Sequence, residues 1–166
     1  KSTSAEREFS FISKPFKETE LSFRVGGPID RFEVYAGNFY HRGDIIAEID
    51  SRDFRIRKER AEAIYHQAKA EFERIKVLYE KNNLSASAYE KAHADYTSAR
   101  TAYETAVNEL EDTRLIAPFD GYIGEVYIEK YQDVKATQSV VSFIDITQLK
   151  ICLLYTSPSP RDGLLS

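Results

Sequence analysis

Hydrophobic and polar residues alternate along four short stretches near the start of the chain, residues 9–11, 21–25, 29–35 and 45–50. Alternation with a period of two is typical of strands with one buried face, and turn signals with proline or glycine separate these stretches. A similar pattern returns after residue 113, with apolar residues at 115–116, 126, 128 and through most of 140–146. Both flanks of the chain are therefore predicted to be β structure.

A different period governs residues 52–112. Its apolar positions recur at steps of three and four, which predicts the seam of a coiled coil. They are Ala61, Tyr65, Ala68, Phe72, Ile75 and Tyr79, followed by Tyr89, Ala92, Tyr96, Ala99, Tyr103, Ala106 and Leu110. Asn82-Asn83-Leu84-Ser85 interrupts both seams, and Ser85 can cap the second helix. We expect an antiparallel hairpin with its tip there and a first helix about 45 Å long.

The two β flanks repeat one pattern on either side of the hairpin. Gly27, Ile29, Phe32 and Val34 match Gly121, Ile123, Val126 and Ile128, and after one inserted residue Ile46, Ile49 and Asp50 match Val141, Ile144 and Asp145. A shared spacing predicts the same chain path twice. Each copy of about 25 residues is too short to bury its own core, so the copies are expected to pack into one interrupted module.

The composition makes some partners of this chain poor candidates. The net charge of -4 gives no basic surface for nucleic acid, and no apolar run approaches the ~20 residues that a membrane span needs. The chain starts at Lys1 without a signal segment and contains no methionine, so we expect an internal fragment. The single Cys152 can form no disulfide within the chain.

Residues 152–166 abandon the alternating pattern just after Leu149-Lys150-Ile151 has begun a new segment. They resemble a translated sequencing adapter, of the kind that ends some assembled fragments. We expect this tail, including Cys152, to be artefactual and to have no part in the fold.

Several motifs, in order around a hairpin, resemble the periplasmic adaptor proteins, or membrane fusion proteins, of the HlyD-like family. The motifs are Leu21-Ser22-Phe23-Arg24-Val25-Gly26-Gly27, Arg42-Gly43-Asp44 with Ile49-Asp50, and Ala117-Pro118-Phe119-Asp120-Gly121-Tyr122-Ile123-Gly124. The resemblance covers roughly residues 20–151. Tyr131 and Thr137 stand where the family often places turn glycines, so these two turns are expected to differ.

The resemblance implies an α+β fold, a split lipoyl-like (biotinyl/lipoyl) β-sandwich with an inserted α-helical coiled-coil hairpin. It divides the chain into the edge of a neighbouring β-barrel (1–19, with a first strand at Glu8 to Ile12), a first lipoyl half (20–50), the hairpin (51–112), a second lipoyl half (113–151) and the tail (152–166).

The resemblance also implies a function without catalysis. It indicates a periplasmic adaptor, associated with the inner membrane, in a tripartite pump that exports drugs or other small molecules. Its expected partners are an inner-membrane resistance-nodulation-division transporter, an outer-membrane TolC-like channel, and further copies in a ring of six. No cofactor, metal or nucleic acid is expected.

A tip motif in this family is thought to contact the outer-membrane channel, and Arg74, Leu78 and Ser85 match its spacing. Arg74 and Leu78 are one helical turn apart on one face, and Leu78 lies outside the seam. From spacing alone the plainer interpretation is a solvated arginine, a leucine beside the helix stripe and an ordinary helix cap. The family context favours the contact.

Two other interpretations of the function remain open, and two further groups of residues are set aside. A lipoyl or biotinyl carrier would need a modified lysine at a hairpin tip, and Lys135 lacks the acidic, small or methionine neighbours of such a site. A type I secretion or ATP-driven pump adaptor would share the hairpin, although those relatives generally have a longer one. His41, His66 and His93 have no zinc-binding spacing, and the basic run from Arg52 to Arg60 is interpreted as a solvated face.

Overall fold

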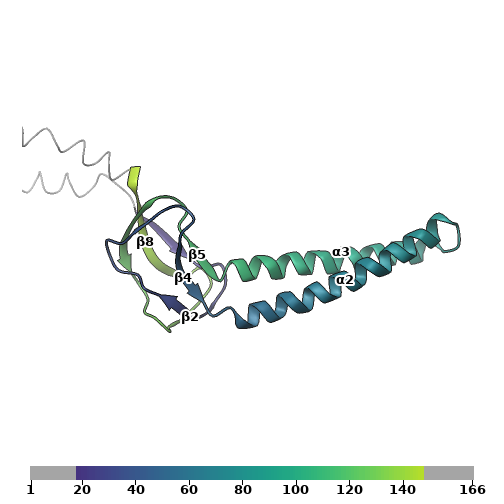
Figure 1. Ribbon diagram of the computed structural model, residues 1–166, viewed down its shortest axis with the longest axis horizontal. Helices are drawn as coiled ribbons and strands as arrows, with labels where there is room; N and C mark the ends of the chain where they lie inside the picture. Colours follow the sequence, from purple (N-terminus) through teal and green to yellow (C-terminus); the bar gives the residue numbers. More distant parts are fainter. Residues whose placement is uncertain (1–17, 148–166) are drawn as a thin grey trace, which may run out of the picture. The chain divides into compact units, whose positions relative to one another are not determined.

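The computed structural model describes residues 18–147 (Figure 1). They fall into two compact units, a β unit made of residues up to Glu48 and from Leu115 onward, and a helical unit of Ile49–Arg114. The predicted barrel strand at Glu8 to Ile12, the segment Leu149-Lys150-Ile151 and the tail from Cys152 lie outside the described residues. The predicted domain bounds at both ends of the chain therefore stay predictions.

The β unit contains two four-stranded sheets, and each half of the chain contributes to both. One sheet has the order β1-β8-β6-β3 and the other β5-β4-β2-β7. The first half supplies β1 (Thr19–Ser22), β2 (Gly27–Phe32), β3 (Phe39–Tyr40) and β4 (Ile45–Ile49). The second half supplies β5 (Arg114–Ile116), β6 (Gly121–Val126), β7 (Asp133–Val134) and β8 (Ser139–Asp145). This arrangement confirms the predicted α+β class and its split β module.

Strands of the first half of the chain pair with strands of the second half. The short strand β3 pairs with β6, and its counterpart β7 pairs with β2, both antiparallel. The edge strand β1 pairs with β8, bringing Leu21 opposite Val141. Neither half can therefore complete its own sheets, which is the physical reason for a single interrupted module.

The core of the β unit is built from both halves. Phe23, Ile29, Ile123 and Phe143 are at most 2% exposed. Burying four such side chains contributes on the order of 1.5–3 kcal/mol each. Val34 is also buried although β2 ends at Phe32, two residues before it. The predicted strand over 29–35 was therefore too long, because burial continued past the last strand residue.

The structural repeat is more regular than the sequence comparison indicated. Main-chain hydrogen bonds at equivalent places, Ile29 N–H to Gln132 C=O (2.8 Å) and Ile123 N–H to Asn38 C=O (2.9 Å), align the halves at one constant spacing. A second pair of equivalent hydrogen bonds has the same spacing. Thr137 N–H donates to Phe23 C=O, and Gly43 N–H donates to Ala117 C=O, each at 2.9 Å. Burial continues this spacing, since Ile46 and Val140 are both buried, as are Ile49 and Phe143. The predicted inserted residue is therefore wrong.

The turns of the two halves also match, contrary to expectation. Tyr131 (φ 71°) has the left-handed backbone of Gly37 (φ 91°), and Thr137 (φ 67°) has that of Gly43 (φ 92°). A side-chain oxygen accepts a main-chain N–H in each turn: Asn38 from Tyr35, Gln132 from Glu129, Asp44 from His41, and Gln138 from Lys135. These bonds hold the same conformation without glycine.

The helical unit contains α2 (Arg52–Glu80, 29 residues) and α3 (Ala86–Glu111, 26 residues), which run side by side as an antiparallel hairpin (Figure 1). The ends of the hairpin meet where Ile49 N–H donates to Thr113 C=O at 2.8 Å. Within residues 18–147, neither helix combines the length and apolar character needed to cross a membrane.

Candidate functional site: surfaces of the hairpin

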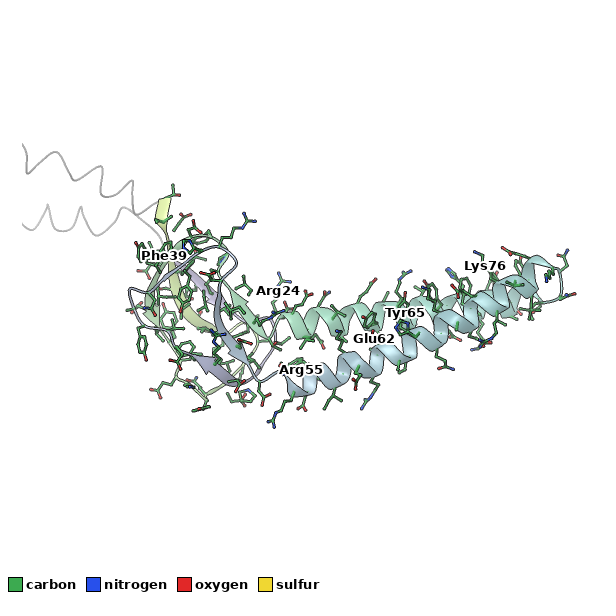
Figure 2. All side chains as sticks on the ribbon, in the orientation of Figure 1. Arg24, Phe39, Arg55, Glu62, Tyr65 and Lys76 are labelled. Carbon is green, nitrogen blue, oxygen red and sulfur yellow. The ribbon has the colours of Figure 1, made fainter. Side chains whose placement is uncertain are left out.

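Aromatic rings fill one edge of the hairpin seam. They form an unbroken series of neighbours, with centroid distances of 5.4 Å for Tyr103–Tyr65, 6.0 Å for Tyr65–Tyr96 and 5.2 Å for Tyr96–Phe72. The series continues to Tyr89 (5.6 Å from Phe72) and ends at Tyr79, 4.4 Å away. A hydrogen bond with Tyr96 raises the pKa of the Tyr65 phenol. Figure 2 shows Tyr65 midway along α2.

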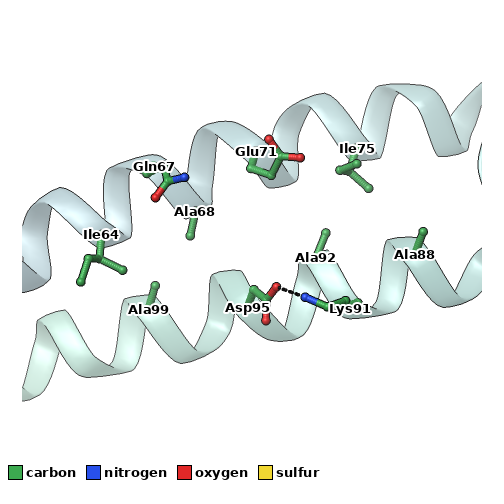
Figure 3. A pocket seen from close by; sticks show the side chains of 10 residues that line it. All are labelled: Ile64, Gln67, Ala68, Glu71, Ile75, Ala88, Lys91, Ala92, Asp95 and Ala99. Carbon is green, nitrogen blue, oxygen red and sulfur yellow. Dashed lines mark hydrogen bonds and ion pairs between the residues drawn. The ribbon is translucent and has the colours of Figure 1, made fainter.

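Alanines form the other edge of the seam and leave a groove of about 390 Å³. Figure 3 shows Ala68 of α2 facing Ala92 and Ala99 of α3. The full lining is Ile64, Gln67, Ala68, Glu71, Ile75, Ala88, Lys91, Ala92, Asp95 and Ala99. Large side chains lie at one heptad position of both helices and small ones at the other. This asymmetry opens the groove on the side of the small residues.

The outer face of α2 carries an exposed apolar row at seven-residue spacing, Ile56, Ala63, Ala70 and Val77, which we call the outer ridge. Ile56 is 56% and Val77 49% exposed. The outermost heptad position is normally polar, so this row is an unpartnered surface. The row was not among the features predicted from the sequence, although its seven-residue spacing is a detectable signal.

The predicted tip residues fall into two groups. Arg74 and Leu78 lie on one face of α2 and line a shallow groove together with Ala70, Glu73 and Val77. Arg74 pairs with Glu71 one turn away, and Leu78 is 42% exposed. The spacing motif does not include Val77, which is nevertheless the more exposed of the two apolar side chains.

Ser85 has a different place, at the N-terminus of α3. Its Oγ accepts a hydrogen bond from the Ala88 N–H at 3.2 Å, so it is the N-cap of that helix. Capping satisfies one of the free N–H groups at the start of a helix. The structure therefore places Arg74 and Leu78 together, and it places Ser85 on the other side of the tip turn as a cap.

The tip turn itself is closed by main-chain hydrogen bonds. Asn82, with φ 59°, donates to Tyr79 C=O at 3.0 Å, and Asn83 donates to Leu78 C=O at 2.9 Å. This pair of bonds, with a left-handed residue just after the helix, is a Schellman motif. Asparagine tolerates that conformation better than most residues that have a side chain.

The remaining candidates from the sequence are dispersed. Lys135 lies in the turn before β8, at the position equivalent to His41. His66 lies beside Glu62 on α2, and His93 packs edge-on against Phe72. Among residues 18–147 no three His, Cys, Asp or Glu side chains are grouped so that they could hold a metal ion.

Comparison with known proteins identifies several relatives of this arrangement. No family model matches the sequence. The chain is 26% identical over 134 residues to the solvent efflux pump periplasmic linker SrpA of Pseudomonas putida, covering 81% of this chain and 35% of that protein. The chain thus spans about a third of the length of the curated relatives it matches.

Solved structures show the same fold. A Bacteroides eggerthii protein described as an efflux transporter is 36% identical with a TM-score of 0.77, over 78% of this chain and 40% of that one. A MacA–MexA chimera carrying the Pseudomonas aeruginosa MexA α-hairpin is 25% identical with a TM-score of 0.70, over 78% and 48%. The split β module with its hairpin therefore recurs in these proteins.

Proposed function

Because the chain belongs to the periplasmic adaptor, or membrane fusion protein, family of efflux pumps, we propose that it is part of a periplasmic bridge between an inner-membrane transporter and an outer-membrane channel. The family is non-enzymatic, so the function is binding and transmission rather than catalysis. The exposed apolar tip of the hairpin is the single observation that carries the proposal for this chain.

The tip would contact the outer-membrane channel through Arg74 and Leu78. Val77 and Leu78 expose adjacent apolar side chains at the last turn of α2, and Arg74 lies one helical turn before Leu78. An exposed leucine beside a cation suits a partner that offers an apolar pocket next to a carbonyl or carboxylate. Ser85 would contribute mainly by capping α3 and fixing the turn.

The test of this contact is Leu78→Asp in the complete adaptor, assayed for binding to a purified TolC-like channel in nanodiscs and for drug export. A charge placed in an apolar contact is expected to weaken binding about tenfold or more, while helicity stays unchanged because the side chain is exposed. Lys76→Asp, also on the exposed surface of α2 near the tip, is the matched control and should bind normally. Full binding and export by the Leu78→Asp variant would refute the contact.

Self-association into a ring, with six copies as the expected number, has its own candidate surfaces. In this proposal the outer ridge of one copy enters the alanine groove of the next. This is a heterologous contact, which forms a ring when the rotation between neighbouring copies closes. Both surfaces have the seven-residue period of meshing helices.

Ala63→Glu tests this packing, because it places a charge in the middle of the outer ridge without touching the seam. The number of copies, measured by mass photometry of the adaptor, should shift toward monomers. Ala94→Glu, the same substitution at the exposed outer position of α3, should leave assembly unchanged. Equal behaviour of the two variants would exclude the ridge as the interface.

We also propose a specific class for the inner-membrane transporter. The resemblance in the lipoyl halves and the tip motif favours a resistance-nodulation-division transporter over an ATP-driven pump or a type I secretion system. A pull-down from the native host with the adaptor as bait, followed by identification of the inner-membrane partner, would decide. Recovery of an ATP-binding subunit would overturn this choice without affecting the bridge itself.

A further inference from the structure

The tip turn depends on a residue that the contact motif does not include. Asn82 is the one residue of the helical unit, within the described part of the chain, whose backbone has a positive φ, 59°. It follows the last helical residue, Glu80, and the cap residue Lys81. Left-handed backbone at this position reverses the chain and stops α2.

The hydrogen bonds of this turn all end on one short stretch of α2. The N–H groups of Lys81, Asn82 and Asn83 donate to the carbonyls of Val77, Tyr79 and Leu78, at 3.2, 3.0 and 2.9 Å. These carbonyls belong to the last turn of the helix, where no later helical N–H is left to bond them. Without the turn, this part of the helix would fray.

The same three residues carry the exposed apolar side chains of the tip. Val77 is 49%, Leu78 42% and Tyr79 37% exposed. Tyr79 also stacks on Tyr89, whereas Val77 and Leu78 receive little packing from their surroundings, so the directions of these two side chains depend on the backbone beneath them. The side chains of Val77 and Leu78 form the surface proposed to contact the channel, which we call the docking surface. The hydrogen bonds of the turn therefore hold the main chain of the same residues whose side chains would contact the partner.

We propose that Asn82 is a positioning residue for the docking surface, which holds the last turn of α2 in place before the partner binds. Ordering a flexible segment on binding weakens the complex, and a segment ordered in advance avoids that loss. Ser85 supports the turn from the other side by capping α3. This inference rests on the proposed contact between the tip and the channel, and it adds a residue that acts through the main chain of α2.

Three variants test it in the complete adaptor, with a purified TolC-like channel in nanodiscs as the probe. Asn82→Ala keeps a small side chain but disfavours the left-handed backbone, so binding should weaken about five- to tenfold. Asn82→Gly restores that backbone freedom and should bind at least as well as the native chain. Asn83→Ala, at an exposed neighbour without positive φ, is the matched control and should change little.

Two readouts separate positioning from general stability. Amide hydrogen exchange at Lys81, Asn82 and Asn83 should accelerate in Asn82→Ala alone, while the helicity of the hairpin stays the same. In a Leu78→Ala background, Asn82→Ala should weaken binding much less than it does in the native chain, because the two changes act on one surface. A purely structural role predicts independent effects.

The outcomes also separate this inference from the contact on which it rests. If Leu78→Asp abolishes channel binding while Asn82→Ala speeds exchange and leaves affinity intact, the contact stands and the positioning role is refuted. Fully additive effects of Leu78→Ala and Asn82→Ala would refute it as well. If Leu78→Asp binds normally, the contact itself is wrong, and the positioning role falls with it.

Discussion

Two residues of the β unit, Tyr131 and Thr137, adopt a left-handed backbone conformation that is unfavourable for residues with a side chain. Thr137 has φ 67° where the equivalent turn of the first half has Gly43 at φ 92°. A Cβ added at Gly43 would meet no atom within 4 Å, so at that turn the conformation, and not crowding, opposes a side chain. Left-handed backbone costs a non-glycine residue roughly 1–2 kcal/mol, and most for β-branched types.

Thr137→Gly is therefore expected to raise the free energy of unfolding by about 1 kcal/mol, since relief of the strained backbone exceeds the entropy that glycine adds to the unfolded chain. The reciprocal Gly43→Thr should lower the free energy of unfolding by a similar amount. Urea denaturation followed by circular dichroism measures both. A loss of stability in Thr137→Gly would show that the threonine side chain makes a compensating contact.

Part of the tip could be predicted at the residue scale and part could not. The four-residue spacing of Arg74 and Leu78 places them on one helical face, as the structure shows. Val77 was missed because a motif of three residues says nothing about their neighbours. The left-handed Asn82 was missed because asparagine in a polar tip is compatible with several turn conformations.

At the scale of elements, the hairpin depends on its aromatic edge. Tyr96 has a ring neighbour on each side, Tyr65 and Phe72, whereas Tyr79 ends the series and is 37% exposed. Each aromatic pair contributes about 0.5–1.5 kcal/mol beyond its buried area. Loss of the Tyr96 ring therefore removes two ring contacts, whereas loss of the Tyr79 ring removes one.

Tyr96→Ala is expected to destabilise the hairpin by about 2 kcal/mol, because it removes two ring contacts and half-buried area in the middle of the seam. Tyr79→Ala, with one ring neighbour at the end, should cost less than half of this. Thermal melting of the helical signal compares the two variants. Equal losses would mean that the series does not stabilise the seam through ring contacts.

Long elements were predictable and very short ones were not. The heptad seams predicted both helices with bounds close to those observed, because a repeated period over many residues has few competing interpretations. The two-residue strands β3 and β7 show no period at all. The register of β8 was wrong by one residue because Val140 to Phe143 are all buried, which removes the alternation that would align it.

At the scale of the molecule, the exchange of strands predicts that neither half folds alone. A chain cut between Asn82 and Asn83 yields one fragment with β2 and β3 and another with their partners β7 and β6. Each fragment by itself should lack sheet structure, while the co-expressed fragments should associate and recover it. Co-purification and circular dichroism test this expectation. A first fragment that shows the native sheet signal alone would contradict it.

The exchanged pairing also has a consequence for the order of folding. Strands β1 to β4 cannot complete their sheets until the second half of the chain is present, so until then they have open edges that are exposed to aggregation. The hairpin needs only local contacts and can form before the sheets do. By joining Ile49 to Thr113 it brings the start of the second half beside the end of the first. A hairpin that folds early would therefore shorten the time for which the strand edges stay open.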